Sequence, residues 1–362
     1  MSLKKIAELA GTSVSTVSRV LNHPEHQCNN HALQEKIWKI AEELHYSPNL
    51  SARNLRIGQN NVASPFVVDI FLARFQKVQQ DDFFMELWHI IQEELLQNQC
   101  ILGETLTSVD IMNLANESKP EEHVPYKSQH LVQTEIKSNT TTFVQRKKDT
   151  GLVILGKCPE HMISIIKKRY AYIVGIDRNP TEHLYDEIVC NGATATEKAL
   201  KHLISLGHKN IAYIGDCSYE ARYIGYYQTL LDHNLPLNYQ NIYPTEQTKE
   251  EGYDAMLRIL EKKDNRPTAI FCANDTTALG VLDALKKKRH RGYTPSVISI
   301  DDIEAAKHSS PMLTTISIPK REMGHLAIAT LLDRKNQYHK ENIRIELPCH
   351  LVERESCDYN YL

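Results

Sequence analysis

Apolar residues recur at helical spacing on both sides of Gly11, close to the start of the chain. The first set predicts a helix with one apolar face, and it consists of Leu3, Ile6, Leu9 and Ala10. Gly11 tolerates the left-handed backbone at which helices commonly end, and Ser13 is suited to cap a second helix. The second set is expected to face inward from that helix, and it consists of Val14, Val17, Val20 and Leu21.

The second predicted helix is rich in small hydroxyl residues and carries one arginine. Its residues outside the apolar set include Ser15, Thr16, Ser18 and Arg19. A short helix, a turn with glycine and a second helix of this kind are typical of a helix-turn-helix, whose second helix enters the major groove of DNA. Arg19 would there reach a guanine edge or a phosphate. The alternative is a solvated face on a small helical bundle.

From residue 62 onward, short apolar runs alternate with amphipathic stretches. The apolar runs predict strands at 64–72, 100–106, 151–155, 171–176, 210–214, 268–272 and 296–300. The amphipathic stretches predict helices at 82–97, 160–169, 192–206, 219–234, 249–263 and 275–289. Such alternation indicates parallel sheets covered by helices on both faces, and the length allows two of them. Residues 107–140 are polar and lack a clear period, so we expect a long, partly irregular surface region there.

The composition is ordinary for a globular protein, but its charge is unevenly distributed. The chain has 362 residues, of which 41% are hydrophobic and 24% charged, and its formal net charge is -3. Basic residues cluster near the N-terminus, and they are Lys4, Lys5, Arg19, Lys36, Lys39, Arg53 and Arg56. This asymmetry fits a small DNA reader attached to a larger, near-neutral body.

The cysteines and the apolar runs predict the cellular compartment of the protein. No pair of the eight cysteines has metal-finger spacing, so buried free thiols in a reducing cytoplasm are the expected state. No apolar stretch suits a signal peptide or a membrane span, which predicts a cytoplasmic protein with no membrane partner. The sequence shows no catalytic or metal-ligating constellation, so we expect no enzyme activity, no metal and no cofactor.

The N-terminal sequence resembles the DNA-binding headpiece of the lactose-repressor (LacI/GalR) family. The runs that carry the resemblance are IAELAGTSVSTVSRVLN and EKIWKIAEELHYSPNLSARNLRIG, which cover nearly all of the first 58 residues. The resemblance implies a three-helix headpiece at 1–46, a hinge helix and linker at 47–60, and an effector-binding and dimerisation core at 61–362. The candidate DNA contacts are Ser13, Val14, Ser15, Thr16, Ser18, Arg19, Asn22, Ala52, Arg53 and Leu55.

The implied hinge helix has a start signal and a candidate wedge residue. Ser47 suits a helix cap, and Pro48 suits the first helical position. Leu55 aligns with the leucine that the family inserts into the minor groove of DNA, which makes it a candidate for insertion between base pairs.

The remaining sequence resembles the two-lobed, periplasmic-binding-protein-like core of the same family. Its landmarks occur in the family's order as DTGLVILGK, HLISLGHKNIAYIGD, AIFCANDTTALGVLDALKK, SVISIDD and PMLTTI. The resemblance implies an α + α/β protein with a first lobe at 62–189 plus 320–346 and a second at 190–319 plus 347–362. The run DDFF at 81–84 replaces an NPFF-like run, and Asn191 stands where an aspartate is usual. The former, with GLVILGK and GVLDALKK, resembles the branch that contains the evolved β-galactosidase repressor.

Polar residues that follow the predicted strands are candidates for holding a ligand in the cleft between the lobes. Ligands of open α/β sheets bind at the carboxyl ends of strands. Three residues occupy such ends and match the family's effector contacts: Arg222, Asn274 and Asp301. A guanidinium, an amide and a carboxylate can each form two hydrogen bonds to the vicinal hydroxyls of a sugar. Asp177 is a fourth candidate, and Phe83 or Phe84 would stack on a sugar ring. The alternatives are a surface ion pair for Arg222, a helix cap for Asn274 and core packing for the two phenylalanines.

The function that we expect is ligand-controlled transcription regulation. The resemblance implies a homodimeric repressor that binds operator DNA and responds to a small sugar, such as a galactoside, between its lobes. The ligand would change the angle between the lobes and thereby the order of the hinge helices. The alternative is a cytoplasmic sugar-binding or sugar-processing protein with no DNA role, and the headpiece favours the regulator.

Overall fold

A computed structural model describes two units of the chain. The described residues are 3–14, 16–17, 20, 33–34, 36–37, 39–40, 65–73, 82–116, 147–218, 220–288 and 292–358. The first unit is Met1–Ser64 and the second is Pro65–Leu362. The predicted hinge helix at 47–60 lies outside the described residues.

In the first unit, helix α1 (Leu3–Ala10) ends where the sequence predicts. Gly11 has a φ of 71°, and the Ser13 hydroxyl accepts a hydrogen bond from the Thr16 amide at 3.1 Å, so Ser13 caps the next helical residues. Among the residues of this unit that the structure describes, the buried apolar side chains are Ile6, Ala7, Ala10, Val17, Val20 and Ile37. The prediction that Leu9 and Val14 face inward is wrong, because these side chains are 47% and 43% exposed and Ala7 packs inward instead.

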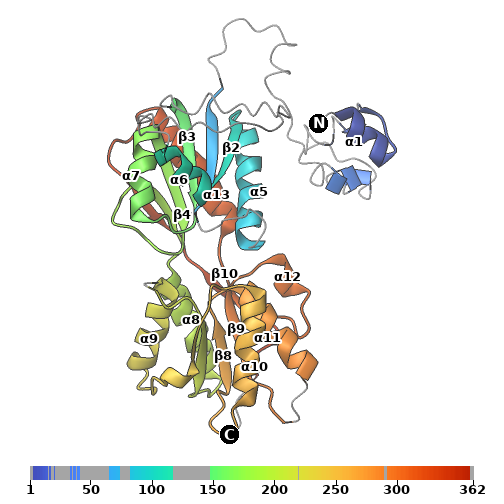
Figure 1. Cartoon of the computed structure of the whole chain (residues 1–362), viewed down its shortest axis with the longest axis vertical. Coiled ribbons are helices and arrows are strands. Elements are labelled where there is room, and N and C mark those ends of the chain that lie inside the picture. Colours follow the sequence, from blue (N-terminus) through green and yellow to red (C-terminus); the bar gives the residue numbers. More distant parts are fainter. Residues whose placement is uncertain are drawn as a thin grey trace, which may run out of the picture. The chain divides into compact units, whose positions relative to one another are not determined.

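The second unit contains two six-stranded sheets (Figure 1). The first has the order β11-β5-β4-β3-β1-β2, with strands Arg344–Glu346, Asp186–Val189, Tyr170–Asp177, Lys147–Leu155, Val67–Leu72 and Ile101–Thr107. The second has the order β12-β10-β9-β8-β6-β7, with strands His350–Val352, Thr314–Ser317, Ser296–Asp301, Ala269–Cys272, Ile211–Gly215 and Ile242–Pro244. Among the described strands every pairing is parallel except that of β12 with β10. The central strands carry almost unbroken apolar runs, as strands covered on both faces must.

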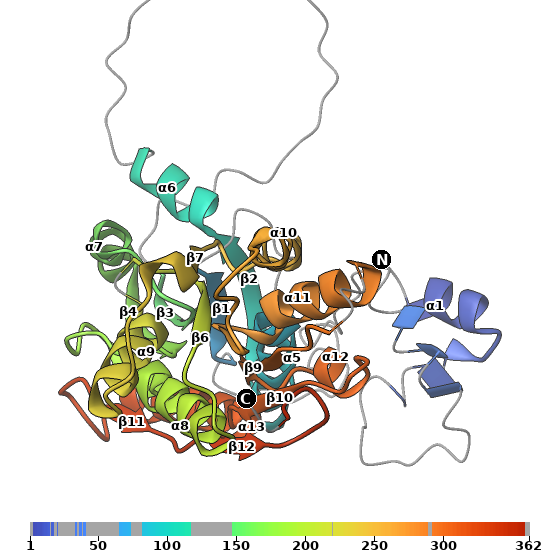
Figure 2. The ribbon, with the colours of Figure 1, turned by 90° about the horizontal axis from the view of Figure 1, so that it is seen from below.

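Helices cover both sheets. Those of the first lobe are α5 (Asp82–Gln97), α6 (Ser108–Asn116), α7 (Glu160–Arg169) and α13 (Lys320–Lys335). Those of the second lobe are α8 (Gly192–Ser205), α9 (Ala221–Asp232), α10 (Lys249–Glu261), α11 (Asp275–Lys288) and the short α12 (Glu304–Lys307). Figure 2 shows α8 and α9 on one side of the second sheet and α10 and α11 on the other.

Helices α10 and α11 approach each other closely because each has a glycine at the contact. A Cβ on Gly280 would lie 2.0 Å from the Lys249 carbonyl oxygen, and one on Gly252 would lie 2.1 Å from that of Thr277. A Cβ has no room at either position, so this packing requires glycine at both.

The chain passes between the lobes three times. Strands β1 to β5 and β11 belong to the first sheet and β6 to β10 and β12 to the second, which confirms the predicted lobe boundaries. Most predicted elements are present within a few residues, and α5 and α7 have the predicted bounds. Several short strands and helix α13 were not predicted from the sequence, nor was α6, which lies inside the span expected to be partly irregular. The rest of that span, 117–140, lies outside the described residues.

Candidate functional site

Polar side chains from both lobes gather where parallel strands end. Strand β4 ends at Asp177 and is followed by Arg178, while β9 ends at Asp301. Glu220 directly precedes α9, and Asn274 follows β8. These groups influence one another electrostatically: Arg222 and Glu220 both act on Asp177, and Asp301 acts on Arg222. The predicted residues Asp177, Arg222 and Asp301 thus belong to one charged cluster, which we call the strand-end cluster, together with Arg178 and Glu220.

Arg222 is 1% exposed, and all of its described contacts lie within the second lobe. Its Nε donates to Glu220 Oε2 at 2.8 Å, one terminal nitrogen donates to the Ala273 carbonyl at 2.6 Å, and the other donates to Gln247 Oε1 at 3.0 Å. Burial alone would lower the pKa of Arg222, but the Glu220 carboxylate raises it above its ordinary value. Arg222 is therefore a charged, fully oriented group, and it is not the surface ion pair that was the alternative.

Two carboxylate oxygens of the strand-end cluster are shielded from solvent and accept no hydrogen bond from any residue that the structure describes. They are Asp177 Oδ2 and Glu220 Oε1. Glu220 is 3% exposed, and its other oxygen is taken by Arg222. Burial raises the pKa of Asp177, and Glu220 adds to this rise. Buried acceptors of this kind carry an energetic penalty until a donor reaches them.

Asp301 joins the two lobes. Its Oδ1 forms an ion pair with the Arg178 guanidinium, and both side chains are 2% exposed. Asp301 and Asp302 have φ values of 132° and 52°, a backbone that few residues other than glycine adopt. Lys320, at the start of α13, donates to the carbonyls of these two residues at 3.0 and 2.8 Å, and so holds the end of β9 in this conformation.

Asn274 is a helix cap in this structure. Its Oδ1 accepts from the Thr277 amide at 3.0 Å, and its Nδ2 donates to the Gln247 carbonyl at 3.2 Å. The capping alternative therefore describes the contacts that are present, although a cap at a strand end is also able to bind a ligand.

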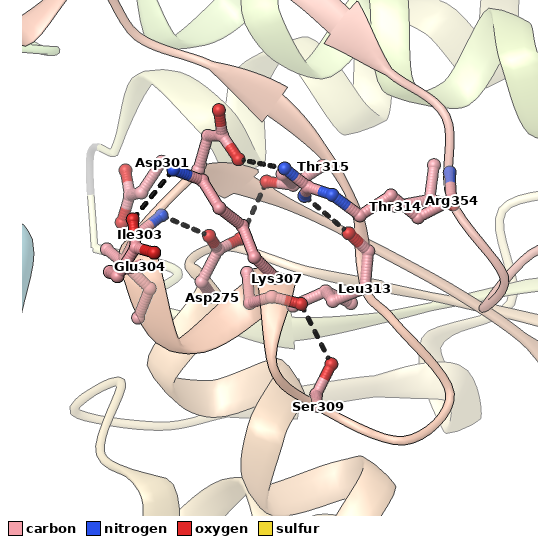
Figure 3. Close-up of polar contacts among 12 residues, drawn as sticks. Asp275, Asp301, Ile303, Glu304, Lys307, Ser309, Leu313, Thr314, Thr315 and Arg354 are labelled. Carbon is pink, nitrogen blue, oxygen red and sulfur yellow. Dashed lines mark hydrogen bonds and ion pairs between the residues drawn. The ribbon is translucent and has the colours of Figure 1, made fainter.

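Asp275, the next residue, is completely buried beneath the end of β9. Its carboxylate accepts hydrogen bonds from the Thr315 hydroxyl at 2.6 Å and from the Ile303 amide at 2.9 Å (Figure 3). It also accepts one from the Ser299 hydroxyl at 2.5 Å. Burial, with a contribution from Asp301, raises the pKa of Asp275 to about 7. The sequence analysis considered this residue only as part of the helix start, so its position below the strand-end cluster is new.

Phe83 and Phe84 are both core residues and neighbours of the strand-end cluster. They are 2% and 3% exposed and pack edge to face at 5.2 Å between ring centroids. The Arg178 guanidinium carbon lies 4.3 Å from the centre of the Phe83 ring, within the range of a cation–π contact. The flat group that stacks on Phe83 in this structure is thus an arginine.

The candidate DNA contacts are described only in part. Ser13 and Val14 are exposed and Thr16 is half-buried. Ser15, Ser18, Arg19, Asn22, Ala52, Arg53 and Leu55 lie outside the described residues. In the parts of the chain that the structure describes, no group of three or more acidic, histidine or cysteine side chains could hold a metal ion. No helix in those parts is long and apolar enough to cross a membrane.

Two family models match the chain. Residues 2–49 match the bacterial regulatory proteins of the lacI family, and residues 200–357 match the periplasmic binding protein-like domain. The chain thus combines a lacI-family DNA-binding domain with a periplasmic-binding-protein-like domain. It is 26% identical over 361 residues to the HTH-type transcriptional repressor PurR of Mannheimia succiniciproducens, with 98% of each chain covered. It is 29% identical to PurR of Yersinia pestis bv. Antiqua, over 98% of this chain and 96% of the relative.

Solved structures of the family share the fold. A transcriptional regulator CelR–cellobiose complex matches with a TM-score of 0.65 and 21% identity, covering 99% of this chain and 100% of that one. The lac repressor dimer bound to operator and the anti-inducer ONPF matches with a TM-score of 0.62 and 21% identity, covering 98% of each. The chain is thus a DNA-binding transcriptional repressor with a ligand-binding core. The narrower resemblance to the branch of the evolved β-galactosidase repressor stays a prediction.

Proposed function

We propose that this repressor acts as a homodimer whose affinity for operator DNA is controlled by a neutral sugar bound at the strand-end cluster. The observation that carries the proposal is the pair of buried acceptor oxygens, Asp177 Oδ2 and Glu220 Oε1. A ligand that satisfies them must donate hydrogen bonds, and sugar hydroxyls are donors that need no charge. Two structural neighbours support a sugar, because the CelR regulator is a complex with cellobiose and a LacI family transcriptional regulator from Enterococcus faecium contains bound ribose.

The charges in the cluster favour a neutral ligand. Each cation already has an anionic partner, because Arg178 pairs with Asp301, Arg222 with Glu220, and Lys320 with Glu86. An anionic ligand would have to compete with these carboxylates for the cations. Burying the ligand's own charge in the site would add a desolvation penalty. A hydroxylated ring adds donors and acceptors without disturbing the balance. A galactoside is one sugar that fits these requirements.

The proposed control runs from the lobes to the DNA. A ligand that contacts Asp177 in the first lobe and Glu220 in the second changes the preferred angle between the lobes. In a dimer this angle sets the spacing of the two hinge segments, for which residues 47–60 are proposed, and so the presentation of Leu55 and the recognition helices to two half-sites. We propose Ser13, Val14 and Arg19 among the residues that contact the operator.

The test uses the full-length chain and a panel of neutral mono- and disaccharides and sugar phosphates, with thermal shift followed by calorimetry. We expect a neutral sugar to bind, and Glu220→Gln to weaken it at least about tenfold, since the amide keeps the Arg222 contact but places a donor where Oε1 accepts. Glu353→Gln is the matched control, because that side chain is 69% exposed. Binding of phosphorylated sugars alone, or equal affinity in both variants, would contradict the proposal.

A further inference from the structure

Arg178 is, with Glu220, one of the two residues of the strand-end cluster that were not predicted from the sequence. It follows β4 in the first lobe, yet its guanidinium pairs with Asp301 at the end of β9 in the second lobe. The two residues are 123 positions apart in the chain, and both are buried. A buried ion pair, formed by direct contact between the two side chains, therefore joins the lobes.

The Arg178 side chain is held from the first lobe as well. Its guanidinium carbon lies 4.3 Å from the centre of the Phe83 ring and 5.6 Å from that of Phe84. Its carbonyl accepts a hydrogen bond from the Gly192 amide at 2.9 Å, where the chain enters the second lobe. A planar cation that stacks on one lobe and pairs with a carboxylate of the other resists separation of the two.

Besides the two hydrogen bonds that Lys320 donates to the carbonyls of Asp301 and Asp302, two others cross between the lobes, and both end on the first amide of a second-lobe helix. Asn179 Oδ1 accepts from the Ala221 amide at 2.8 Å, and Glu86 Oε1 accepts from the Glu304 amide at 2.8 Å. Neither α9 nor α12 has a side-chain hydrogen bond from its own N-cap residue. The first lobe thus supplies the acceptors that these amides need, and separation of the lobes would leave both amides to water.

We propose that the Arg178 side chain itself occupies the effector site at the strand-end cluster, where it lies between Phe83 and Asp301. In the ligand-free protein it takes the place of a ligand there and so holds the two lobes together. An aromatic ring on one side and a carboxylate on the other are the contacts that a sugar ring with its hydroxyls would use. An effector then acts by displacing Arg178 and making its own contacts with Phe83 and Asp301. This last step rests on the proposed sugar-binding function, whereas the closure of the ligand-free lobes does not.

The test compares hydrogen exchange of full-length wild type and Arg178→Met without any sugar present. Methionine keeps an unbranched, apolar chain over Phe83 but removes the cation, so the pair with Asp301 is lost. We expect the Ala221 and Glu304 amides to exchange at least about tenfold faster, because both bonds depend on lobe contact. Arg178→Lys, which keeps the charge, should restore part of the protection.

The controls separate closure from stability. Arg321→Met removes an arginine that is 76% exposed and that pairs with the exposed Glu93, so it should leave both amides protected. Amides within β8 report the integrity of the second lobe. Faster exchange at Ala221 and Glu304 alone supports the proposal. Unchanged exchange at both, or equal acceleration throughout β8, would overturn it, since the latter means that Arg178 only stabilises the fold. Neither outcome bears on whether sugars bind.

Discussion

Asp275 offers a test of the electrostatics beneath the strand-end cluster. Its carboxylate is fully buried, and its pKa is raised from 3.8 to about 7. Between these two pH values the folded protein holds a proton that the unfolded chain has lost, so the free energy of unfolding falls as the pH rises. Each pH unit contributes about 1.4 kcal/mol, which amounts to about 4 kcal/mol over the whole interval. The loss begins above the unfolded pKa and is complete above about pH 7.

The substitution that isolates this effect is Asp275→Asn. The amide oxygen is able to accept from the Ile303 amide, and the amide nitrogen is able to donate to the hydroxyls of Ser299 and Thr315, which can rotate. The neutral variant thus keeps the three contacts and avoids the charge. We expect it to be more stable than wild type, by a margin that grows by roughly 3 kcal/mol between pH 5 and pH 8.

Urea unfolding at a series of pH values measures this margin. Asp283→Asn, on the same helix and 44% exposed, is the matched control and should follow the wild type throughout. If the stabilities of wild type and Asp275→Asn run parallel from pH 5 to pH 8, the carboxylate titrates as in water and the reasoning from burial is refuted.

Two further predictions concern the strand-end cluster and the proposed DNA contact at Leu55. Arg222→Ala should destabilise the second lobe by about 3–5 kcal/mol in urea unfolding, because Glu220 is left as an unpaired buried charge. A loss below about 1 kcal/mol, as for an exposed pair, would refute this. Leu55→Ala should weaken operator binding far more than binding to random duplex, which phosphate contacts supply, and should reduce the effector's influence. Equal loss on both DNAs would show that Leu55 is no wedge.

Sequence periodicity was sufficient for most long helices of the second unit, with α13 as the exception. The apolar spacing of residues 82–97 predicted α5 to the residue, because a long amphipathic helix shows its period without help from tertiary contacts. Strands of three or four residues, such as β5, β11 and β12, carry no such pattern. Their pairing depends on what the rest of the chain places beside them, and it could not be predicted locally.

Candidate site residues could be predicted where a polar side chain follows a predicted strand. Their partners could not be predicted where they come from a distant part of the chain. Arg222 and Asp301 were found by position, but the cation that pairs with Asp301 lies in the other lobe. Glu220 had a local signal, because a carboxylate two residues before a buried arginine is within reach of its Nε. The inward assignment of Leu9 failed because Ala7, a small residue on the same short helix, takes the buried place, and nothing in the structure explains the exposure of Val14.

The interleaved sheets have a consequence for the order in which the protein can be made. Strand β11 at 344–346 completes the first sheet beside β5 at 186–189, and β12 at 350–352 completes the second. On the ribosome, each lobe therefore keeps an open sheet edge until residues 344–352 have emerged. A premature stop before residue 344 would leave both lobes incomplete at once, so loss of a short C-terminal piece should be as damaging to the first lobe as to the second.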